Sequence, residues 1–261
     1  MKYVRTFLLA LQSEFISRAN IVGWFIVGAI PSVILALVWL AILGDKQSIN
    51  GFTKGDFVLY YLFVTFSWYI VGGNFAFPVG NGIKDGRINM TLLKPYNVVF
   101  GLCIQEQAWK ALSFIIALPF ALIVLYLFRD DIHIKLTLIQ NVMLFISLIL
   151  GAIIFAFLEA LAGISAFWVT EMWPIAHVNG MLFSLFGGRM LPLTLMPPVI
   201  LFIANLLPYK YIFHIPVSIL LSKSSNMYLD IGLQFLYICI LALIYQFVWI
   251  KGIQKYEAIG S

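Results

Sequence analysis

The sequence predicts an all-α integral membrane protein, and its composition gives the first two reasons. Hydrophobic residues make up 62% of the 261 residues, whereas charged residues make up only 10%. A soluble domain carries about 25% charged residues, because its surface must face water. A chain with so few charges must turn much of its apolar surface toward lipid.

The third reason is a series of apolar runs of membrane-spanning length. A helix needs about 20 apolar residues to cross the bilayer core. The stretch from Ile21 to Leu43 has no charge and contains 14 Leu, Ile, Val or Phe residues. These residues contribute about −4 to −8 kcal/mol of insertion free energy, whereas one central charge costs about 2.5 to 3.5 kcal/mol. This stretch therefore spans the membrane, and Pro31 is expected to kink its helix without breaking it.

Similar reasoning along the chain predicts six transmembrane helices in a single domain. Their ranges are 21–43, 57–79, 108–128, 138–166, 174–191 and 229–250. Between the last two, residues 197–221 contain two apolar runs that prolines bound, each too short to cross a bilayer. We expect a re-entrant or outer helical hairpin there, because such backbone must be buried in protein or line a cavity.

The first 20 residues are expected to form an amphipathic helix in the plane of the membrane interface. Val4, Phe7, Leu8 and Leu11 fall on one helical face, and polar residues fall elsewhere. A helix of this kind lies on the membrane and leads into the first span.

The basic residues indicate the orientation of the chain. Six spans place both termini on one side, where nine Lys and Arg residues lie, against seven on the other side. The positive-inside rule therefore favours cytoplasmic termini. The net charge is +5, but the basic residues are scattered between apolar blocks. This pattern predicts contact with lipid headgroups and no binding of nucleic acid.

Residues 80–96, after the second predicted span, form a polar, glycine-rich segment on the predicted cytoplasmic side. Ile83, Ile88, Leu92 and Leu93 give this segment an apolar side. An exposed apolar ridge flanked by charges suits the groove of a protein partner. The alternative is a solvated loop that packs on its own helices.

The sequence contains no recognisable catalytic or metal-binding motif. It has no G-x-x-x-x-G-K-[ST] and no H-E-x-x-H, and its three histidines lie in separate boundary regions. Cys103 and Cys239 are distant from each other and have no histidine neighbours. We therefore expect no catalytic residues, no metal site and no cofactor in this chain.

Glu159 is the carboxylate that falls inside the fourth predicted span. An ionisable group in lipid is a functional candidate by default, but near the interface it usually pairs with a cation. Arg18, Arg87 and Lys110 are the candidate partners, and structural pairing is the favoured interpretation.

Two motifs after the second span resemble the permease subunits of ABC-2-type transporters. The first is Gly82-Ile-Lys-Asp-Gly-Arg-Ile88 and the second is Leu92-Leu-Lys-Pro95. They match the subgroup with G-x-x-D-G-x-I followed by L-L-[RK]-P. Lys94 stands where Arg is more usual, which retains the cation.

The second half of the chain carries a further match to the same family. After the fifth span the family has a turn of Gly and Pro residues and then L-P-[FY]. This chain has Gly187-Gly-Arg-Met-Leu-Pro-Leu193 and then Leu207-Pro-Tyr209. Six spans, an interfacial first helix and a hairpin before the last span also agree, so the resemblance covers almost the whole chain.

The resemblance implies a non-catalytic half-transporter that exports its substrate across a bacterial plasma membrane. Two permeases, identical or different, would pair, and each would dock a separate cytoplasmic ATPase that binds ATP and Mg. Residues 80–96 would form the coupling element. The contact residues implied for the ATPase are Ile83, Asp85, Gly86, Arg87 and Ile88.

The resemblance also implies a substrate route between the two permeases, closed at its outer end near the hairpin. The outer gate residues implied are Gly187, Gly188 and Pro192. As a hypothesis, the aromatic stripe of Tyr61, Trp68 and Tyr69 holds a hydrophobic or cationic substrate, because aromatic faces attract cations. The alternative is that these rings pack against neighbouring helices.

Two functions from other classes remain as alternatives. A stand-alone secondary carrier of a hydrophobic or cationic solute requires ionisable groups at mid-membrane. A membrane-embedded enzyme acting on lipids requires clustered Asp, Glu or His at one interface. The sequence shows neither cluster.

Overall fold

The structure, a computed structural model, describes residues 2–16, 18–89 and 98–256, and helices make up all of its regular elements. The all-α class predicted from the sequence is confirmed. The elements are α1 (Lys2–Ile16), α2 (Arg18–Leu43), α3 (Lys54–Val71), α4 (Ala76–Lys84), α6 (Val98–Leu127), α7 (Leu138–Ile164), η1 (Ser165–Phe167), α8 (Trp173–Phe186), η2 (Leu193–Leu195), α9 (Pro198–Asn205), α10 (Lys210–Leu220) and α11 (Met227–Lys255).

Five segments of the described chain are long and apolar enough to cross a membrane. They are Asn20–Leu43, Lys54–Lys84, Ile104–Leu127, Leu138–Phe167 and Met227–Lys255. Helices α9 and α10 form a pair bent by 109°, which gives a sixth crossing if the pair is counted as one broken span.

Helix α8 is shorter than the span expected over 174–191. It has 14 residues, which at 1.5 Å per residue gives a length of about 21 Å. This length falls short of a hydrocarbon core of about 30 Å. A crossing by residues 174–191 therefore stays a prediction.

Helices α3 and α7 begin where polar side chains satisfy free backbone amides. Thr53 and Asp56 form a capping box at the start of α3, and Thr137 and Gln140 form another at the start of α7. Each pair gives oxygen acceptors to amides that have no partner within the helix. These caps fix where the chain enters the two helices.

Helix α7 lies at the centre of the fold and packs against α4, α8, α10 and α11. The largest apolar cluster surrounds its middle, where Phe183 of α8 packs against Phe155 of α7 and Phe213 of α10. A second group of helices, α1, α2, α3 and α6, packs on the other side of the molecule. Apolar side chains such as Leu37, Leu122 and Leu243 stay exposed on the outside, as lipid contact requires.

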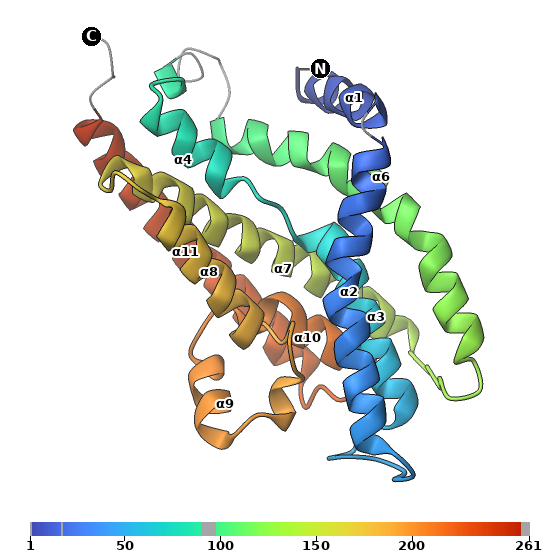
Figure 1. The fold of residues 1–261 in the computed structure, drawn as a ribbon. Helices are drawn as coiled ribbons and strands as arrows, with labels where there is room; N and C mark the ends of the chain where they lie inside the picture. The colour runs from blue at the N-terminus through green and yellow to red at the C-terminus, as the bar shows by residue number, and fades with distance from the viewer. Residues whose placement is uncertain (1, 17, 90–97, 257–261) are drawn as a thin grey trace.

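Figure 1 shows how the ends of the helices are distributed. The N-terminal helix α1, the C-terminal end of α11 and helix α4 lie at one end of the bundle. Helix α9 and the connection between α2 and α3 lie at the other end. Helix α1 lies across the end of α2 and packs along α6. We call the end that holds both termini the terminal end, and the other the distal end.

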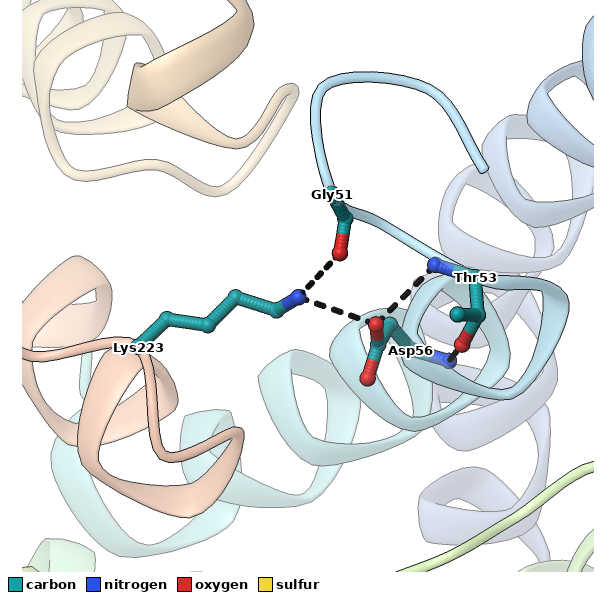
Figure 2. Close-up of polar contacts among 4 residues, drawn as sticks. All are labelled: Gly51, Thr53, Asp56 and Lys223. Atoms are coloured by element: carbon teal, nitrogen blue, oxygen red, sulfur yellow. Dashed lines mark hydrogen bonds and ion pairs between the residues drawn. The ribbon is translucent and has the colours of Figure 1, made fainter. Parts of the chain in front are cut away.

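A polar junction ties two connections together at the distal end (Figure 2). The Lys223 ammonium donates hydrogen bonds to the Gly51 carbonyl and to Asp56 Oδ2, the latter at 3.0 Å. The same Asp56 oxygen accepts from the Thr53 amide at 3.0 Å, and the Asp56 amide donates to Thr53 Oγ1 at 3.3 Å. The junction therefore joins the capping box of α3 to the segment between α10 and α11.

Candidate functional site

The segment predicted to dock a partner forms a tight turn at the terminal end of the bundle. Helix α4 ends at Lys84, and Gly86 follows with a φ of +73°, a left-handed conformation that favours glycine. The Arg87 guanidinium donates to Asp85 Oδ2 at 2.6 Å. The two side chains are 62% and 51% exposed, respectively. We call residues 84–87 the charged turn.

The two isoleucines of this motif are buried inside the chain. Ile83 is 3% exposed and Ile88 is 2% exposed. Both belong to an apolar cluster with Phe75 and Val79 from the second span, Ile164 at the end of α7 and Phe167 of η1. The Gly86 turn reverses the chain, which directs both isoleucines toward α7.

The expected exposed apolar ridge is therefore wrong for Ile83 and Ile88. The accessible part of the motif consists of Lys84, Asp85 and Arg87, with Gly86 half-buried between them. Leu92 and Leu93, together with Lys94 and Pro95, lie outside the described residues.

An ion pair fixes the charged turn to the segment before α8. The Lys84 ammonium contacts Glu171 Oε1, and both side chains are exposed. This pair and the isoleucine cluster hold the turn against α7 and the start of α8. A force on the turn therefore acts on both helices.

The predicted aromatic stripe of α3 divides into two environments. Tyr61 is 2% exposed, and its hydroxyl donates to the Met190 carbonyl at 2.9 Å. Trp68 lies below the Arg189 guanidinium, which is 4.5 Å from the ring centroid. Tyr69 packs near Trp109 of α6, with ring centroids 6.1 Å apart. Tyr61 thus has a packing role, whereas Trp68 and Tyr69 reach a cavity.

Of the residues predicted as an outer gate, Gly188 contacts helix α3. Gly188 has a φ of +80°, and its carbonyl accepts a hydrogen bond from the Tyr60 hydroxyl. Gly187 forms the C-terminal cap of α8, and Pro192 precedes η2. The structure therefore brings Gly188 together with the buried tyrosines of α3, while Pro192 lies farther along the connection.

A pocket of about 990 Å³ opens between α1, α2, α3 and α6. Trp68 and Tyr69 line it, as does the linker of residues 73–75 between α3 and α4. Glu14 of α1 and Glu106 of α6 also line it. No sequence motif assigns these two carboxylates to a site. Their shared location depends on α1 folding back along α6, which no local pattern predicts.

Glu159 is buried, with two hydrogen-bond donors where a cation was expected. The Ala76 amide donates to Oε2 at 3.3 Å, and Asn179 Nδ2 donates to Oε1 at 3.1 Å. The Tyr209 hydroxyl in turn donates to Asn179 Oδ1 at 2.8 Å. These bonds join α4, α7, α8 and the start of α10 through one buried polar chain.

No group of three or more His, Cys, Asp or Glu residues with the geometry of a metal site occurs in the described part of the chain. Glu14 and Glu106 line the pocket, and Glu159 accepts hydrogen bonds from the Ala76 amide and from Asn179.

The family of the chain follows from comparison with known proteins. A family model described as "ABC-2 family transporter protein" matches residues 29–260. No curated protein matches the chain, and no solved structure matches it. The match covers most of the chain, from α2 to the residues after α11. Together with the all-helical fold and its membrane-spanning segments, it shows that this chain is a membrane protein of the ABC-2 family of transporters.

Proposed function

We propose that this chain is the permease subunit of an ATP-driven exporter. Two permeases form the substrate pathway, and each docks a separate cytoplasmic ATPase, which binds ATP and Mg. The family implies an ATPase partner, and its permeases are typically non-catalytic and bind no cofactor themselves. In this proposal the protein lies in a bacterial plasma membrane with the terminal end of the bundle in the cytoplasm.

The observation that carries the proposal is the charged turn anchored by two buried isoleucines. Asp85 and Arg87 expose their charges, while Ile83 and Ile88 attach the turn to the end of α7. A docking element needs both properties, because a partner must contact its surface and its motion must reach the bundle. We assign the contacts to Asp85, Gly86 and Arg87 and the anchoring to the isoleucines.

The route by which motion reaches the distal end runs along the second span. Residues 72–75 join α4 to α3, so displacement of the charged turn pulls on α3. The first half of α3 is bound to the turn after α8 through Tyr60–Gly188 and Tyr61–Met190. In the proposed cycle these two hydrogen bonds are intact while the distal end is closed, and they break when it opens.

Affinity purification of the tagged chain from its native host in mild detergent tests this proposal. Mass spectrometry then identifies the proteins that remain bound. We expect a stoichiometric ATPase subunit, together with a second permease subunit if the pair is heteromeric.

The matched comparison uses two multiple-alanine variants. Replacing Asp85, Gly86 and Arg87 with Ala is expected to release the ATPase. Replacing Arg129 and Asp130 with Ala is expected to have no effect, because this exposed pair lies between α6 and α7 at the other end of the bundle. A chain that purifies alone, under conditions that preserve other such complexes, would contradict the proposal and favour a stand-alone secondary carrier.

A further inference from the structure

The pocket between α1, α2, α3 and α6 combines an acidic rim with an aromatic wall. Glu14 and Glu106 lie on its lining, on the helices that meet at the terminal end. The aromatic wall consists of Trp24, Trp68, Tyr69, Phe75 and Trp109. The volume of about 990 Å³ lies at the upper end of the range for small-molecule sites, about 300 to 1,000 Å³.

The charges on the lining favour a cation. Among the described residues that line the pocket, two are carboxylates and none is Lys, Arg or His. Glu14 of α1 and Glu106 of α6 line the same pocket. A positive charge inside this pocket is attracted by both carboxylates.

Two basic residues lie near the pocket but outside its lining. Lys110 attracts Glu106, and its ammonium lies 3.4 Å from the Ile70 carbonyl. Arg189 stacks on the Trp68 ring. Lys110 therefore offsets part of the charge of Glu106, whereas Glu14 forms no ion pair with any described residue. The pocket keeps an attraction for cations centred on Glu14.

The aromatic wall supplies the second property that a hydrophobic cation requires. Trp24 of α2 is 60% exposed. Tyr69 of α3 and Trp109 of α6 lie close to each other. Aromatic faces attract cations electrostatically and also bury apolar groups. A ligand with one charged centre and an apolar body therefore matches both parts of the lining.

We propose that this pocket binds hydrophobic cations, namely molecules with a single positive centre surrounded by alkyl or aromatic groups. Glu14 and Glu106 hold the charge, and Trp24, Tyr69 and Trp109 hold the apolar body. This inference rests on the proposed function in one respect, since it makes such a cation the substrate class of the exporter. Binding itself requires neither ATP nor the ATPase.

The test measures binding of tetraphenylphosphonium to the full-length chain in lipid nanodiscs, without nucleotide. Tetraphenylborate serves as the matched probe, because it has the same shape and the opposite charge. Nanodiscs without protein give the partition of each probe into lipid. We expect saturable binding of the phosphonium probe and none of the borate probe.

Variants of the carboxylates then locate the site. Glu14→Gln and Glu106→Gln are each expected to weaken phosphonium binding about tenfold, the effect of losing one partly desolvated charge contact. Glu14→Lys is expected to abolish phosphonium binding and to create binding of the borate. Asp45→Asn, an exposed carboxylate in the connection between α2 and α3, is the matched control and should bind as the wild type does.

Lipid headgroups with an ammonium group also carry a positive charge that the pocket would attract. Two lipid compositions therefore distinguish a lipid ligand from a free hydrophobic cation. If phosphatidylethanolamine discs weaken phosphonium binding relative to phosphatidylglycerol discs, the lipid ammonium competes for the same pocket, which also supports a cation site. Equal affinities in the two lipids assign the pocket to free hydrophobic cations.

Equal binding of both probes, or unchanged binding in a folded variant with both glutamates replaced by Gln, would overturn the proposal. This result is independent of the ATPase experiment. A chain that retains its ATPase but binds no cation refutes only the pocket, and a chain that binds the cation but purifies without an ATPase refutes only the exporter.

Discussion

The Tyr60 hydroxyl donates a hydrogen bond to the Gly188 carbonyl, although the two residues are 128 positions apart in the chain. Gly188 accepts this bond in a left-handed conformation, with a φ of +80°. A Cβ atom added at Gly188 would lie 2.9 Å from the same hydroxyl. The contact therefore depends on both residues, and it closes α3 against the turn after α8.

Substitutions of Tyr60 and of Gly188 are both expected to destabilise the fold, and the substitution of Gly188 is expected to cost more. Tyr60→Phe removes one hydrogen bond and should lower the free energy of unfolding by about 1 kcal/mol. Gly188→Ala forces a left-handed alanine, which costs about 1 to 2 kcal/mol, and also crowds the Tyr60 hydroxyl. Titration with SDS in mixed micelles measures both values.

Gly180→Ala is the control for Gly188→Ala, because Gly180 lies in α8 with no heavy atom within 4 Å of an added Cβ. It should leave stability unchanged or raise it slightly, since alanine favours a helix. Equal effects of the two glycine substitutions would show that the turn after α8 tolerates a side chain.

Replacing Asp56 is expected to destabilise the fold more than replacing its partner Lys223. Asp56→Ala removes the ion pair and the acceptor for the Thr53 amide, so it should cost about 1 to 2 kcal/mol. Lys223→Ala leaves the capping box in place and should cost less, about 0.5 to 1 kcal/mol.

A double-mutant cycle on Asp56 and Lys223 measures the coupling between them. We expect a coupling energy of about 0.5 to 1 kcal/mol that falls at high salt. Strictly additive effects would mean that the two charges do not interact in the membrane-bound protein. Lys135→Ala, at an exposed site in the connection between α6 and α7, serves as the control.

Asn179 is the central member of the buried chain from Tyr209 to Glu159, and its loss should be the most costly. Asn179→Ala leaves both the Glu159 carboxylate and the Tyr209 hydroxyl without this partner. The expected cost is about 2 to 4 kcal/mol, because each buried group without a partner costs about 1 to 3 kcal/mol. Tyr209→Phe removes only the outer bond and should cost about 1 kcal/mol.

The same unfolding titration, run on both variants, checks this order. An equal or larger effect of Tyr209→Phe would show that Asn179 is not the central member of the hydrogen bonds from Tyr209 to Glu159. Asn179→Asp adds a discriminating case, since a second carboxylate beside Glu159 should destabilise the fold more than alanine does.

The buried isoleucines and the exposed charges of residues 83–88 predict opposite phenotypes. Ile88→Ala should lower the free energy of unfolding by about 2 to 4 kcal/mol, because it leaves a cavity beside Ile164 and Phe167. Arg87→Glu should leave stability within about 0.5 kcal/mol, as is usual for an exposed site. It should instead weaken binding of the ATPase.

Pull-down of the ATPase and unfolding titration, measured on the same preparations, separate the two effects. If Arg87→Glu unfolds the protein while the ATPase stays bound, the assignment of roles within the motif is reversed. Arg129→Glu is the matched control, since its side chain is 64% exposed and Arg87 is 62% exposed.

The sequence predicts the helical class because long uncharged runs have few alternatives in a membrane. Ile21–Leu43 carries this signal, and α2 covers all of it. The break within the second span was not predicted. Two consecutive glycines, Gly72 and Gly73, end α3 before α4 begins at Ala76, and the hydropathy of the region does not reveal the interruption.

The candidate sites were less accessible to sequence reasoning, because their residues meet only in the tertiary fold. The motif of residues 82–88 was recognisable, but the burial of its isoleucines depends on a turn at Gly86 that brings them to α7. Glu159 was recognised as buried, yet its partner Asn179 lies on another helix. The pocket requires α1 to pack along α6, so Glu14 and Glu106 carried no local signal.

Site-specific photo-crosslinking in intact cells tests whether the charged turn contacts a separate ATPase. A photoreactive amino acid is placed in turn at positions 85, 87, 83 and 129. We expect crosslinks to an ATPase from positions 85 and 87, and none from the buried position 83 or from position 129 at the distal end. The absence of crosslinks from positions 85 and 87, or equal crosslinking from position 129, would contradict this expectation.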